Sequence, residues 1–494
     1  MKYDVIIIGS GIGGLLCGNI LSREGYNVCL LEKNNRLGGS LQSFGRKGAV
    51  FNTGLNYTES LDEGQILNQY FRYFGLIDKL QLKRLDTDGF DIISLPSGKY
   101  PMAIGHENFR EHLVKHFPAE KDNLSRYLET IKGICNSIAF YSLSDKSFNI
   151  MQCPSLGIGA ADYIRSEIKD YTLQNVLAGN NLMYAGHERK TPLLLHSLIN
   201  NSFIESAWRV IDGSHLLIKT LADNITGNGG TILTNSRAVR FRNENGTLRS
   251  VITENGEELE ARFFISGTHP DQLLTMIDQK ISTAFNLRIR SLEDTIGMFS
   301  VYLVFKKESF PYLNYNYYHY KQENTWLAGN YSIKEWPQTF VLMCTASSKS
   351  DRYAQSASVL TYMQYDELKE WENTKTGCRG EKYEQFKRNK CEVLLDSVEK
   401  EFPGIRSCVE AYYSSTPLTW RDYTGTRAGS AFGLLKDFNR PIESIIMPRT
   451  KIPNLFLTGQ NTNMHGILGV TISAVITAGE IVDIKNLVRK IRNA

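Results

Sequence analysis

The sequence predicts an α/β fold with a parallel sheet, and three features near the N-terminus support this prediction. Asp4–Ile8 is a short β-branched run typical of a buried strand, and the glycine-rich turn Gly9–Gly14 follows it directly. Leu15–Arg23 then has the pattern of a helix, and Asn27–Leu31 is a second apolar strand. A strand, a tight turn, a helix and a strand in this order are typical of a Rossmann-like nucleotide-binding unit.

The turn Gly9–Gly14 has the spacing Gly-x-Gly-x-x-Gly, and each of these glycines has a physical role. Gly9 permits the turn, Gly11 lets backbone N–H groups approach a diphosphate, and Gly14 lets the helix pack closely on the strand. Glu32 follows the second strand, at about the spacing (~20 residues) of the acid that accepts hydrogen bonds from a ribose. We therefore expect a bound dinucleotide, and the alternative is a Rossmann-like half without a ligand.

A second pair of glycines, within Arg36–Ser40, indicates which dinucleotide to expect. Glycines directly after the acid extend the phosphate cradle, which FAD needs and a simple nicotinamide domain does not; the alternative is an ordinary surface turn. Near the C-terminus, Thr458–Asn461 forms another glycine-rich turn together with Gly466 and Gly469. We expect both turns to contact one FAD molecule.

Further motifs carry a resemblance to a known family. They are Phe-Asn-Thr-Gly-Leu-Asn-Tyr at 51–57, Asp-Gly-Ser-His-Leu at 212–216, Ser-Gly-Thr-His-Pro at 266–270, Ser-Thr-Pro-Leu-Thr at 415–419, Tyr-Thr-Gly-Thr at 423–426, the stretch 429–433 and the block 455–479. With them the chain resembles, nearly from end to end, the phytoene desaturase, carotenoid isomerase and retinol saturase group of amine-oxidase-like flavoproteins. The Ser-Thr-Pro stretch and the C-terminal turn are the more specific signals, because many flavoproteins share the N-terminal turn.

Four positions depart from the pattern of that family. The family usually has arginine or threonine at Ser40, aspartate at Asn52, glycine at Asp212 and an acid at Asn461. The acid at the last position would accept a hydrogen bond from the ribityl chain. An asparagine there still accepts through its carbonyl, and it donates as well.

The glycine pattern and the resemblance together predict which residues contact FAD. The resemblance implies that Val239 lies against the adenine and that residues 54–56 lie beside the flavin ring. The expected contacts are Gly9, Ser10, Gly11, Gly13, Gly14, Glu32, Lys33, Arg36, Gly38, Gly39, Ser40, Gly54, Leu55, Asn56, Val239, Gly459, Gln460, Asn461, Gly469, Val470 and Thr471.

Since both terminal turns must reach one ligand, the FAD-binding domain is expected to be discontinuous. It comprises 1–85, 205–290 and 440–494, and 86–204 and 291–439 form a mixed α/β substrate domain. In the FAD-binding domain, strands at Ile232–Phe241 and Leu248–Thr253 are predicted to form a hairpin with an Asn-Gly turn.

The substrate domain is predicted to contain a strand at Ser300–Phe305 and helices near Glu120–Ile138 and Tyr383–Glu401. Tyr312–Tyr320 holds five tyrosines in nine residues and has high strand propensity. These tyrosines either line a tunnel for an extended apolar ligand or belong to an ordinary sheet surface.

Composition excludes several classes of function. A net charge of +4 over 494 residues, without a dense basic block, argues against a nucleic-acid partner. The 8 cysteines have neither CxxC pairs nor zinc spacing, so we expect no metal and a reducing cytoplasmic location. The chain also lacks a GxSxG elbow, an HExxH motif and a P-loop. The cofactor is therefore expected to carry the chemistry.

The resemblance then implies an oxidoreductase that acts on carbon–carbon bonds of a polyene or isoprenoid lipid, with an apolar small molecule as its partner. The C-terminal turn favours the retinol saturase branch, but residues alone do not give the direction of the reaction. One alternative is a redox-neutral isomerase that uses reduced flavin. Another is a flavin-free carrier, because the prenyl-carrier and GDP-dissociation-inhibitor relatives keep the fold without flavin. The sequence does not indicate the oligomeric state.

Two residues are candidates for catalysis. His465 lies in the loop between the C-terminal glycine turn and the last long apolar segment, where the flavin ring is expected. It would donate or accept a proton as the hydride moves; the alternative is a hydrogen-bonded loop histidine. Tyr57 follows the segment that the family places beside the ring, and it is expected to form a wall facing that ring.

Two C-terminal segments bear on membrane contact. Asn454–Gly479 carries no charge and is long enough to span a bilayer, but polar residues interrupt it, and a strand, a turn and a buried helix explain it better. Ile481–Arg492 has apolar residues near helical spacing and basic residues between them. It would either lie on anionic lipid, which makes the protein peripheral to the membrane, or pack as a terminal helix.

Overall fold

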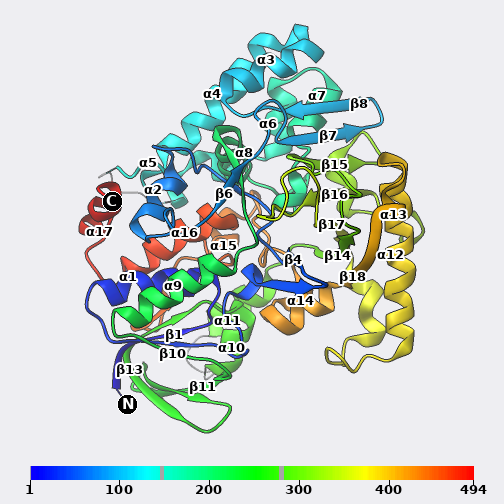
Figure 1. Ribbon diagram of the computed structural model, residues 1–494. Helices are drawn as coiled ribbons and strands as arrows, with labels where there is room; N and C mark the ends of the chain where they lie inside the picture. The colour runs from blue at the N-terminus through cyan, green and yellow to red at the C-terminus, as the bar shows by residue number, and fades with distance from the viewer. Residues whose placement is uncertain (1, 145–149, 278–282) are drawn as a thin grey trace.

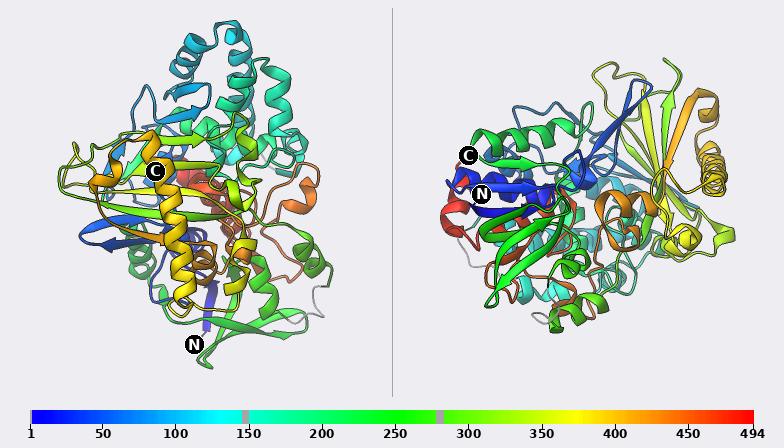
Figure 2. Two further views of the ribbon diagram at one scale, coloured as in Figure 1. Left: turned by 90° about the vertical axis from the view of Figure 1, so that its right-hand side faces the viewer. Right: turned by 90° about the horizontal axis from the view of Figure 1, so that it is seen from below.

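The computed structural model describes residues 2–144, 150–277 and 283–494. Within these residues, two seven-stranded sheets lie side by side and helices pack around them (Figures 1 and 2). The predicted α/β class is confirmed. The division into two domains at the boundaries given above stays a prediction.

The first sheet contains the N-terminal strand and has the order β10-β2-β1-β13-β12-β11, with β19 also paired to β13. β1 pairs in parallel with β2 and β13, and β10 and β19 extend this parallel part. The strands are β1 (Lys2–Ile8), β2 (Val28–Leu31), β10 (Thr231–Leu233), β11 (Ala238–Glu244), β12 (Thr247–Thr253), β13 (Glu258–Ser266) and β19 (Leu455–Leu457). Residues from both ends of the chain therefore share one sheet.

The hairpin is confirmed, but its first strand is shorter than predicted. Ile232–Phe241 divides into β10 and β11, because β10 pairs in parallel with β2 whereas β11 pairs antiparallel with β12. Asn235, with a φ of 52°, turns the chain between them. The β11–β12 turn holds Asn245 and Gly246 at φ values of 51° and 81°, the left-handed conformation that a two-residue hairpin turn requires.

The second sheet has the order β18-β14-β17-β16-β15-β7-β8. Its strands are β7 (Asp91–Leu95), β8 (Gly98–Met102), β14 (Gly297–Phe305), β15 (Asn316–Tyr320), β16 (Thr339–Cys344), β17 (Ser356–Met363) and β18 (Val409–Ser415). β14 contains the predicted strand, and every residue of β14 and β17 is buried. In the tyrosine-rich run only Asn316–Tyr320 is a strand, and its tyrosines lie in the core. The tyrosines of β15 therefore belong to the sheet, and they are buried in the core instead of lying on the sheet surface.

Helices cover both sheets, and the two predicted in the substrate domain are present as α4 and α12. Figure 1 shows α12 along the outer side of the second sheet. The helices are α1 (Ile12–Arg23), α2 (Ile66–Tyr73), α3 (His106–His116), α4 (Lys121–Ser137), α5 (Ala139–Ser142), α6 (Ala160–Glu167), α7 (Tyr171–Leu177), α8 (Leu193–Glu205), α9 (His215–Gly227), α10 (Pro270–Met276), α11 (Thr283–Ser291), α12 (Glu381–Glu401), α13 (Ile405–Cys408), α14 (Pro417–Thr424), α15 (Pro441–Ser444), α16 (Gly466–Ala478) and α17 (Ile484–Arg492). Short strands complete the fold: β3 (Ser43–Arg46), β4 (Ala49–Asn52), β5 (Thr58–Glu59), β6 (Leu82–Arg84) and β9 (Ala207–Val210).

The structure distinguishes between the alternatives for the two C-terminal segments. The uncharged one is, as expected, a strand (β19), a turn and a buried helix (α16). The amphipathic one forms α17, but Leu487, Val488 and Ile491 are buried in the core cluster that also contains α2. Of the two alternatives for this segment, the structure shows the packed terminal helix, because the apolar face packs inside the chain. None of the helices described here has the length and apolarity needed to cross a bilayer.

Candidate functional site

The two glycine-rich turns at opposite ends of the chain touch each other. A Cβ atom added to Gly13 would lie 2.9 Å from both the Cα and the N of Gly459, and one added to Gly14 would lie 2.1 Å from the carbonyl oxygen of Gly9. Real Cβ atoms do not approach so closely, so any side chain at these positions would displace backbone. The expected meeting of the two ends is therefore present.

A groove of about 270 Å³ opens beside this contact, along the turn that follows β1. A Cβ atom on Gly11 would meet nothing within 4 Å, so the backbone there faces open space. Fourteen of the predicted cofactor contacts line the groove: Gly9, Ser10, Gly11, Gly13, Gly14, Glu32, Lys33, Gly39, Ser40, Val239, Gly459, Gln460, Asn461 and Val470. The groove thus joins the glycine turn, the acid and the C-terminal turn on one surface.

The carboxylate of Glu32 is buried and held in place by the protein. It accepts hydrogen bonds from the N and Oγ of Ser10, at 3.0 and 2.5 Å, and from the N of Asn34 at 2.9 Å. Since a carboxylate offers about four acceptor positions, it retains capacity for a ligand hydroxyl. Gly38 donates its N–H to the backbone O and the Oγ of Ser10. Gly38 therefore stabilises the turn through the backbone and side chain of Ser10, and it does not line the groove.

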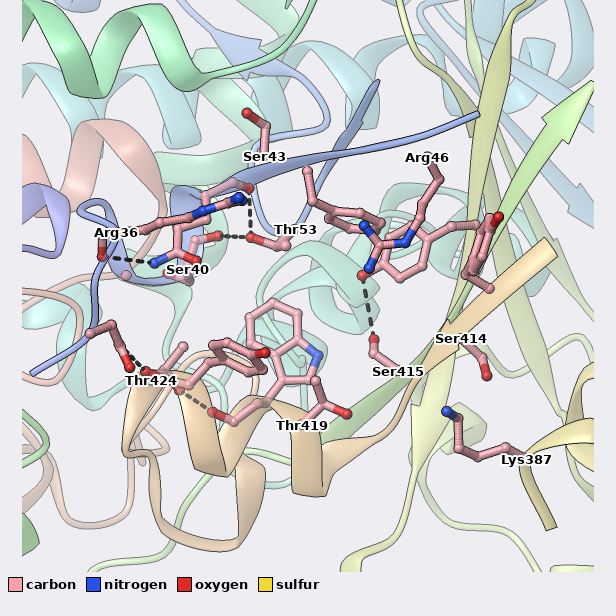
Figure 3. A pocket seen from close by; sticks show the side chains of 18 of the residues that line it. Arg36, Ser40, Ser43, Arg46, Thr53, Lys387, Ser414, Ser415, Thr419 and Thr424 are labelled. Atoms are coloured by element: carbon pink, nitrogen blue, oxygen red, sulfur yellow. Dashed lines mark hydrogen bonds between the residues drawn. The ribbon is translucent and has the colours of Figure 1, made fainter. Parts of the chain in front are cut away.

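Arg36 lies in a neighbouring cavity of about 960 Å³, which shares Lys33, Gly39 and Ser40 with the groove. Figure 3 shows Arg36 and Ser40 at one end of this cavity, with Arg46 and Lys387 at the other. The cavity connects the phosphate cradle to β14, β18 and α14, since residues of all three line it.

Three of the four positions that depart from the family pattern, Asn52, Asp212 and Asn461, have side chains that accept hydrogen bonds within the chain. Asn461 accepts from the N of Leu434 at 3.0 Å through Oδ1, so the protein uses one of the two acceptor positions of that carbonyl. The Oδ1 of Asn52 accepts from the N and Oγ of Ser214. Asp212 has a φ of 57°, a left-handed conformation that glycine adopts more readily than other residues.

A third cavity, of about 80 Å³, lies against the start of α16 and holds both catalytic candidates. Gly469 lines this cavity and Val470 lines the groove, so the N-terminal part of α16 borders both. Its remaining walls are largely apolar: Leu55, Met183, Leu195, Leu198, Ile199, Phe203, Phe432, Met464, Ile467, Leu468 and Ile472. An extended molecule that follows α16 from the groove would reach an apolar space.

Besides Arg36 and Gly38, five predicted contacts do not line the groove. Gly54, Leu55 and Gly469 line the third cavity, which agrees with a position beside the ring. Thr471 is fully buried in α16, and its Oγ1 donates to the carbonyl of Ile467 at 2.8 Å. The side chain of Thr471 thus bonds within the helix, and its cofactor contact stays a prediction. Asn56 is absent from the lining of all the cavities described above.

His465 is buried, and neither ring nitrogen has a hydrogen-bond partner among the described residues. Burial, followed by the nearby charge of Lys436, lowers the pKa of His465 to about 3, so the ring is neutral at pH 7. The ring lies 5.4 Å from that of Phe432, between centroids. The side chain of Asn463 in the same loop is also buried and has no partner within the described residues. The alternative of a hydrogen-bonded loop histidine therefore does not describe His465.

Tyr57 contributes its ring to the third cavity, but its hydroxyl is bonded to the protein. That hydroxyl lies 2.7 Å from the hydroxyl of Tyr318 and donates to the Oδ2 of Asp91 at 3.1 Å. Burial raises the pKa of Tyr57 well above its ordinary value. This position agrees with the prediction that Tyr57 forms a wall of the space beside the flavin ring.

Two ionisable residues of the site are not among the residues predicted from the sequence. Glu59 lines the third cavity and is only 7% exposed. Lys436 is buried behind the C-terminal turn, where its Nζ donates to the carbonyls of Thr462 at 2.6 Å, Asn461 at 3.1 Å and Ser444 at 3.3 Å. Each is a single charged residue that belongs to no recognisable motif. Glu59 stands two positions after Tyr57, so in an extended strand the two side chains point to the same face, and this is the one feature of the sequence that could have indicated Glu59.

Comparisons with known proteins agree with this geometry. The family model described as flavin containing amine oxidoreductase matches residues 12–482. All-trans-retinol 13,14-reductase of Macaca fascicularis is 25% identical, over 99% of this chain and 88% of that protein. Chloroplastic prolycopene isomerase of Daucus carota is 23% identical, over 97% and 79%.

Solved structures show the same fold at low sequence identity. An oxidoreductase from Methanosarcina mazei has a TM-score of 0.64 and 14% identity, covering 96% of this chain and 99% of the other. Wild-type putrescine oxidase bound to putrescine has a TM-score of 0.66 and 13% identity, covering 98% and 99%.

Proposed function

Because the chain belongs to the flavin-containing amine oxidoreductase family, we propose that this FAD-dependent oxidoreductase reduces a carbon–carbon double bond of a polyene lipid. One observation carries the proposal: α16 borders both the dinucleotide groove and a largely apolar cavity lined by His465, whose ring nitrogens have no partner among the described residues. The cavity has room for one end of a ligand, and its lining suits an end that is mostly hydrocarbon and carries one polar group.

The residues present fit FAD. The backbone at Gly11 leaves open space, Glu32 retains acceptor capacity, and the N-terminus of α16 supplies the partial positive charge that favours an electron-rich group. When bound, FAD supplies hydride chemistry that side chains do not provide. The protein's own part is to hold the cofactor and substrate and to exclude water.

The lining of the third cavity supports a polyene alcohol as substrate. Burying an apolar chain is favourable by about 25 cal/mol per Å², which suits a ligand with few polar handles. A neutral imidazole at His465 would hold a hydroxyl group, since each ring nitrogen lacks a partner among the described residues. In retinol, which the names of the reductase relatives specify, the 13,14 double bond lies next to the carbon that bears the hydroxyl. Both groups would then enter the same cavity.

The relatives support reduction over the two alternatives. The retinol reductases of Macaca fascicularis and Homo sapiens are 25% and 24% identical over 88% of their length, whereas the prolycopene isomerase of Daucus carota is 23% identical over 79%. Isomerisation remains the second candidate because it would use the same cofactor and cavity. The flavin-free carrier is not favoured, since the matched family contains flavin.

We expect the purified protein to be yellow and, after anaerobic reduction of its flavin with dithionite, to consume all-trans-retinol. The absorbance of the conjugated chain should fall and the product should gain two hydrogens in mass, because one double bond is removed. Absorbance is followed in a sealed cuvette, and mass spectrometry identifies the product. Protein with oxidised flavin is the control and should leave retinol unchanged.

The possible products separate the alternatives. A product of unchanged mass would replace reduction with isomerisation. A product with fewer hydrogens in the sample with oxidised flavin, the only state of the flavin that accepts a hydride, would indicate desaturation. Bound flavin with no change in retinol, β-carotene or phytoene would remove the polyene proposal. Protein that neither carries nor takes up FAD would contradict the fit described above.

A substrate of this kind resides in lipid, so the proposal includes contact between the cytoplasmic enzyme and a membrane surface. α17 does not offer an apolar face, but Leu287 and Ile442 are 66% and 71% exposed. Their segments touch, because the Nη2 of Arg288 donates to the carbonyl of Ile442 at 2.8 Å. These two side chains are the candidate contact.

We expect the protein to float with anionic phosphatidylserine vesicles and the double variant Leu287→Glu/Ile442→Glu to float at least several-fold less, because two charges would replace the buried apolar contact. Density-gradient flotation measures the bound fraction. Ile333→Glu, at a side chain that is 60% exposed elsewhere, is the matched control. Wild-type protein that stays at the bottom of the gradient contradicts membrane contact.

A further inference from the structure

The third cavity contains a buried carboxyl group that the proposed function does not yet use. Glu59 ends β5, and its side chain lies against the first turn of α16. Its Oε1 accepts from the N of Leu468 at 3.1 Å, and its Oε2 accepts from the Oγ1 of Thr58 at 3.1 Å. The carboxyl group is thereby fixed in orientation while it faces a mainly apolar space.

Burial raises the pKa of Glu59, whereas the Leu468 N–H and the Thr58 hydroxyl lower it. Burial is the largest of these effects, because a carboxylate loses its water shell in an apolar surrounding. A carboxyl group that keeps its proton nearer to neutral pH is the state required of a general acid.

A polyene that is not conjugated to a carbonyl group is difficult to reduce by hydride addition alone. When a hydride adds to such a double bond, no carbonyl oxygen is present to accept the π electron pair of that bond. Protonation of one carbon first produces a cation that the remaining double bonds delocalise, and the hydride then adds to that cation. The site therefore needs an acid at the double bond itself.

Among the residues that line the third cavity, Tyr57, Glu59 and His465 are the ones that ionise. The Tyr57 hydroxyl is engaged by Tyr318 and Asp91, and burial raises its pKa well above the ordinary value. His465 is neutral at pH 7 because its pKa is about 3, so it holds no imidazolium proton to give. Glu59 is the remaining acid.

We propose that Glu59 is the catalytic proton donor for the double bond, an inference that rests on the proposed function. Its O–H bond breaks, and the π electron pair of the substrate forms a new C–H bond with that proton. The neighbouring carbon, now cationic, takes a hydride, with its electron pair, that reduced flavin supplies as the two-electron reductant. Glu59 is left as a carboxylate, stabilised by the Leu468 N–H and the start of α16, and regains a proton from water.

The test compares three variants of the full-length protein with bound FAD. Glu59→Gln keeps an acceptor for the Leu468 N–H but has no acidic proton, and Glu59→Asp keeps the acid on a shorter side chain. Glu205→Gln is the matched control, because Glu205 is a nearby carboxylate that accepts from the Oγ of Ser60 and does not line the cavity. We expect Glu59→Gln to slow oxidation of the reduced flavin by retinol by about 10²- to 10⁴-fold, Glu59→Asp to recover part of that loss, and Glu205→Gln to have little effect.

Two readouts are independent of polyene turnover. Reoxidation of the reduced flavin by ferricyanide involves no carbon protonation and should be unchanged in Glu59→Gln. Infrared spectra should show a carboxylic acid band that persists above the ordinary titration range of glutamate and is missing from Glu59→Gln, also in flavin-free protein.

The outcomes separate this inference from the proposed function. If wild-type protein reduces retinol and Glu59→Gln does so equally fast, Glu59 is not the donor and the function stands. If wild-type protein reduces no polyene, the function fails, and this role of Glu59 fails with it even if the infrared band is present. Absence of the band in wild-type protein together with full activity of the variant overturns the inference alone.

Discussion

Gly14→Ala is expected to abolish FAD binding and to lower the stability of the fold. Its added Cβ would lie 2.1 Å from the carbonyl oxygen of Gly9 and 3.3 Å from the Cγ2 of Ile7, so the turn and α1 would have to separate. Overpacking of this kind costs about 1–3 kcal/mol, and here it falls on the backbone of the cradle itself. Flavin absorbance of the purified variant and its free energy of unfolding in urea measure the two effects.

Gly11→Ala is the matched control because its Cβ would meet no protein atom within 4 Å and would point into the groove. The variant should lose at most about 1 kcal/mol of stability, the cost of alanine at a helix N-cap, yet bind FAD at least ten-fold more weakly. Titration of flavin-free protein with FAD gives the affinity. Full flavin occupancy in both variants would mean that the cofactor does not lie on this turn.

Lys436→Met is expected to remove a large pH dependence of stability. Burial, together with the nearby charge of Arg288, lowers the pKa of Lys436 to about 7 in the folded protein. The unfolded chain, with an ordinary lysine pKa of about 10.4, binds the extra proton between these values. Stability therefore rises with pH across this window, by at most about 1.4 kcal/mol for each pH unit.

Urea unfolding of wild-type and Lys436→Met protein between pH 7 and 10 measures this contribution as the difference between the two stabilities. Taking the difference removes the effects of the buried tyrosines and cysteines, which both proteins share. Lys451→Met, at an exposed position, is the control and should leave the slope unchanged. A stability difference between wild type and Lys436→Met that stays flat with pH would show that Lys436 does not lose its proton on folding.

Local signals were sufficient for the elements that build the cofactor groove. The Gly-x-Gly-x-x-Gly turn, the strands on either side of it and the Asn-Gly hairpin were predicted because their geometry depends on a few adjacent residues. The sequence does not predict that Ile232–Phe241 divides into β10 and β11, because this division depends on their partners: β10 pairs with β2, whereas β11 pairs with β12. Likewise, the amphipathic pattern of α17 left packing on the protein and contact with lipid as alternatives, and only the fold shows that its apolar face packs with the core around α2.

The sequence by itself determined the fold class, the cofactor and the meeting of the two chain ends, because glycine spacing and strand pattern are local properties with direct geometric consequences. Only the tertiary structure decided which ionisable groups belong to the site. Glu59 and Lys436 acquire their shifted pKa values from burial among segments far away in sequence. Asn461 likewise bonds to Leu434 because the fold brings that backbone beside it. Desolvation and hydrogen bonding depend on what surrounds an atom in space, and neighbours along the chain do not specify those surroundings.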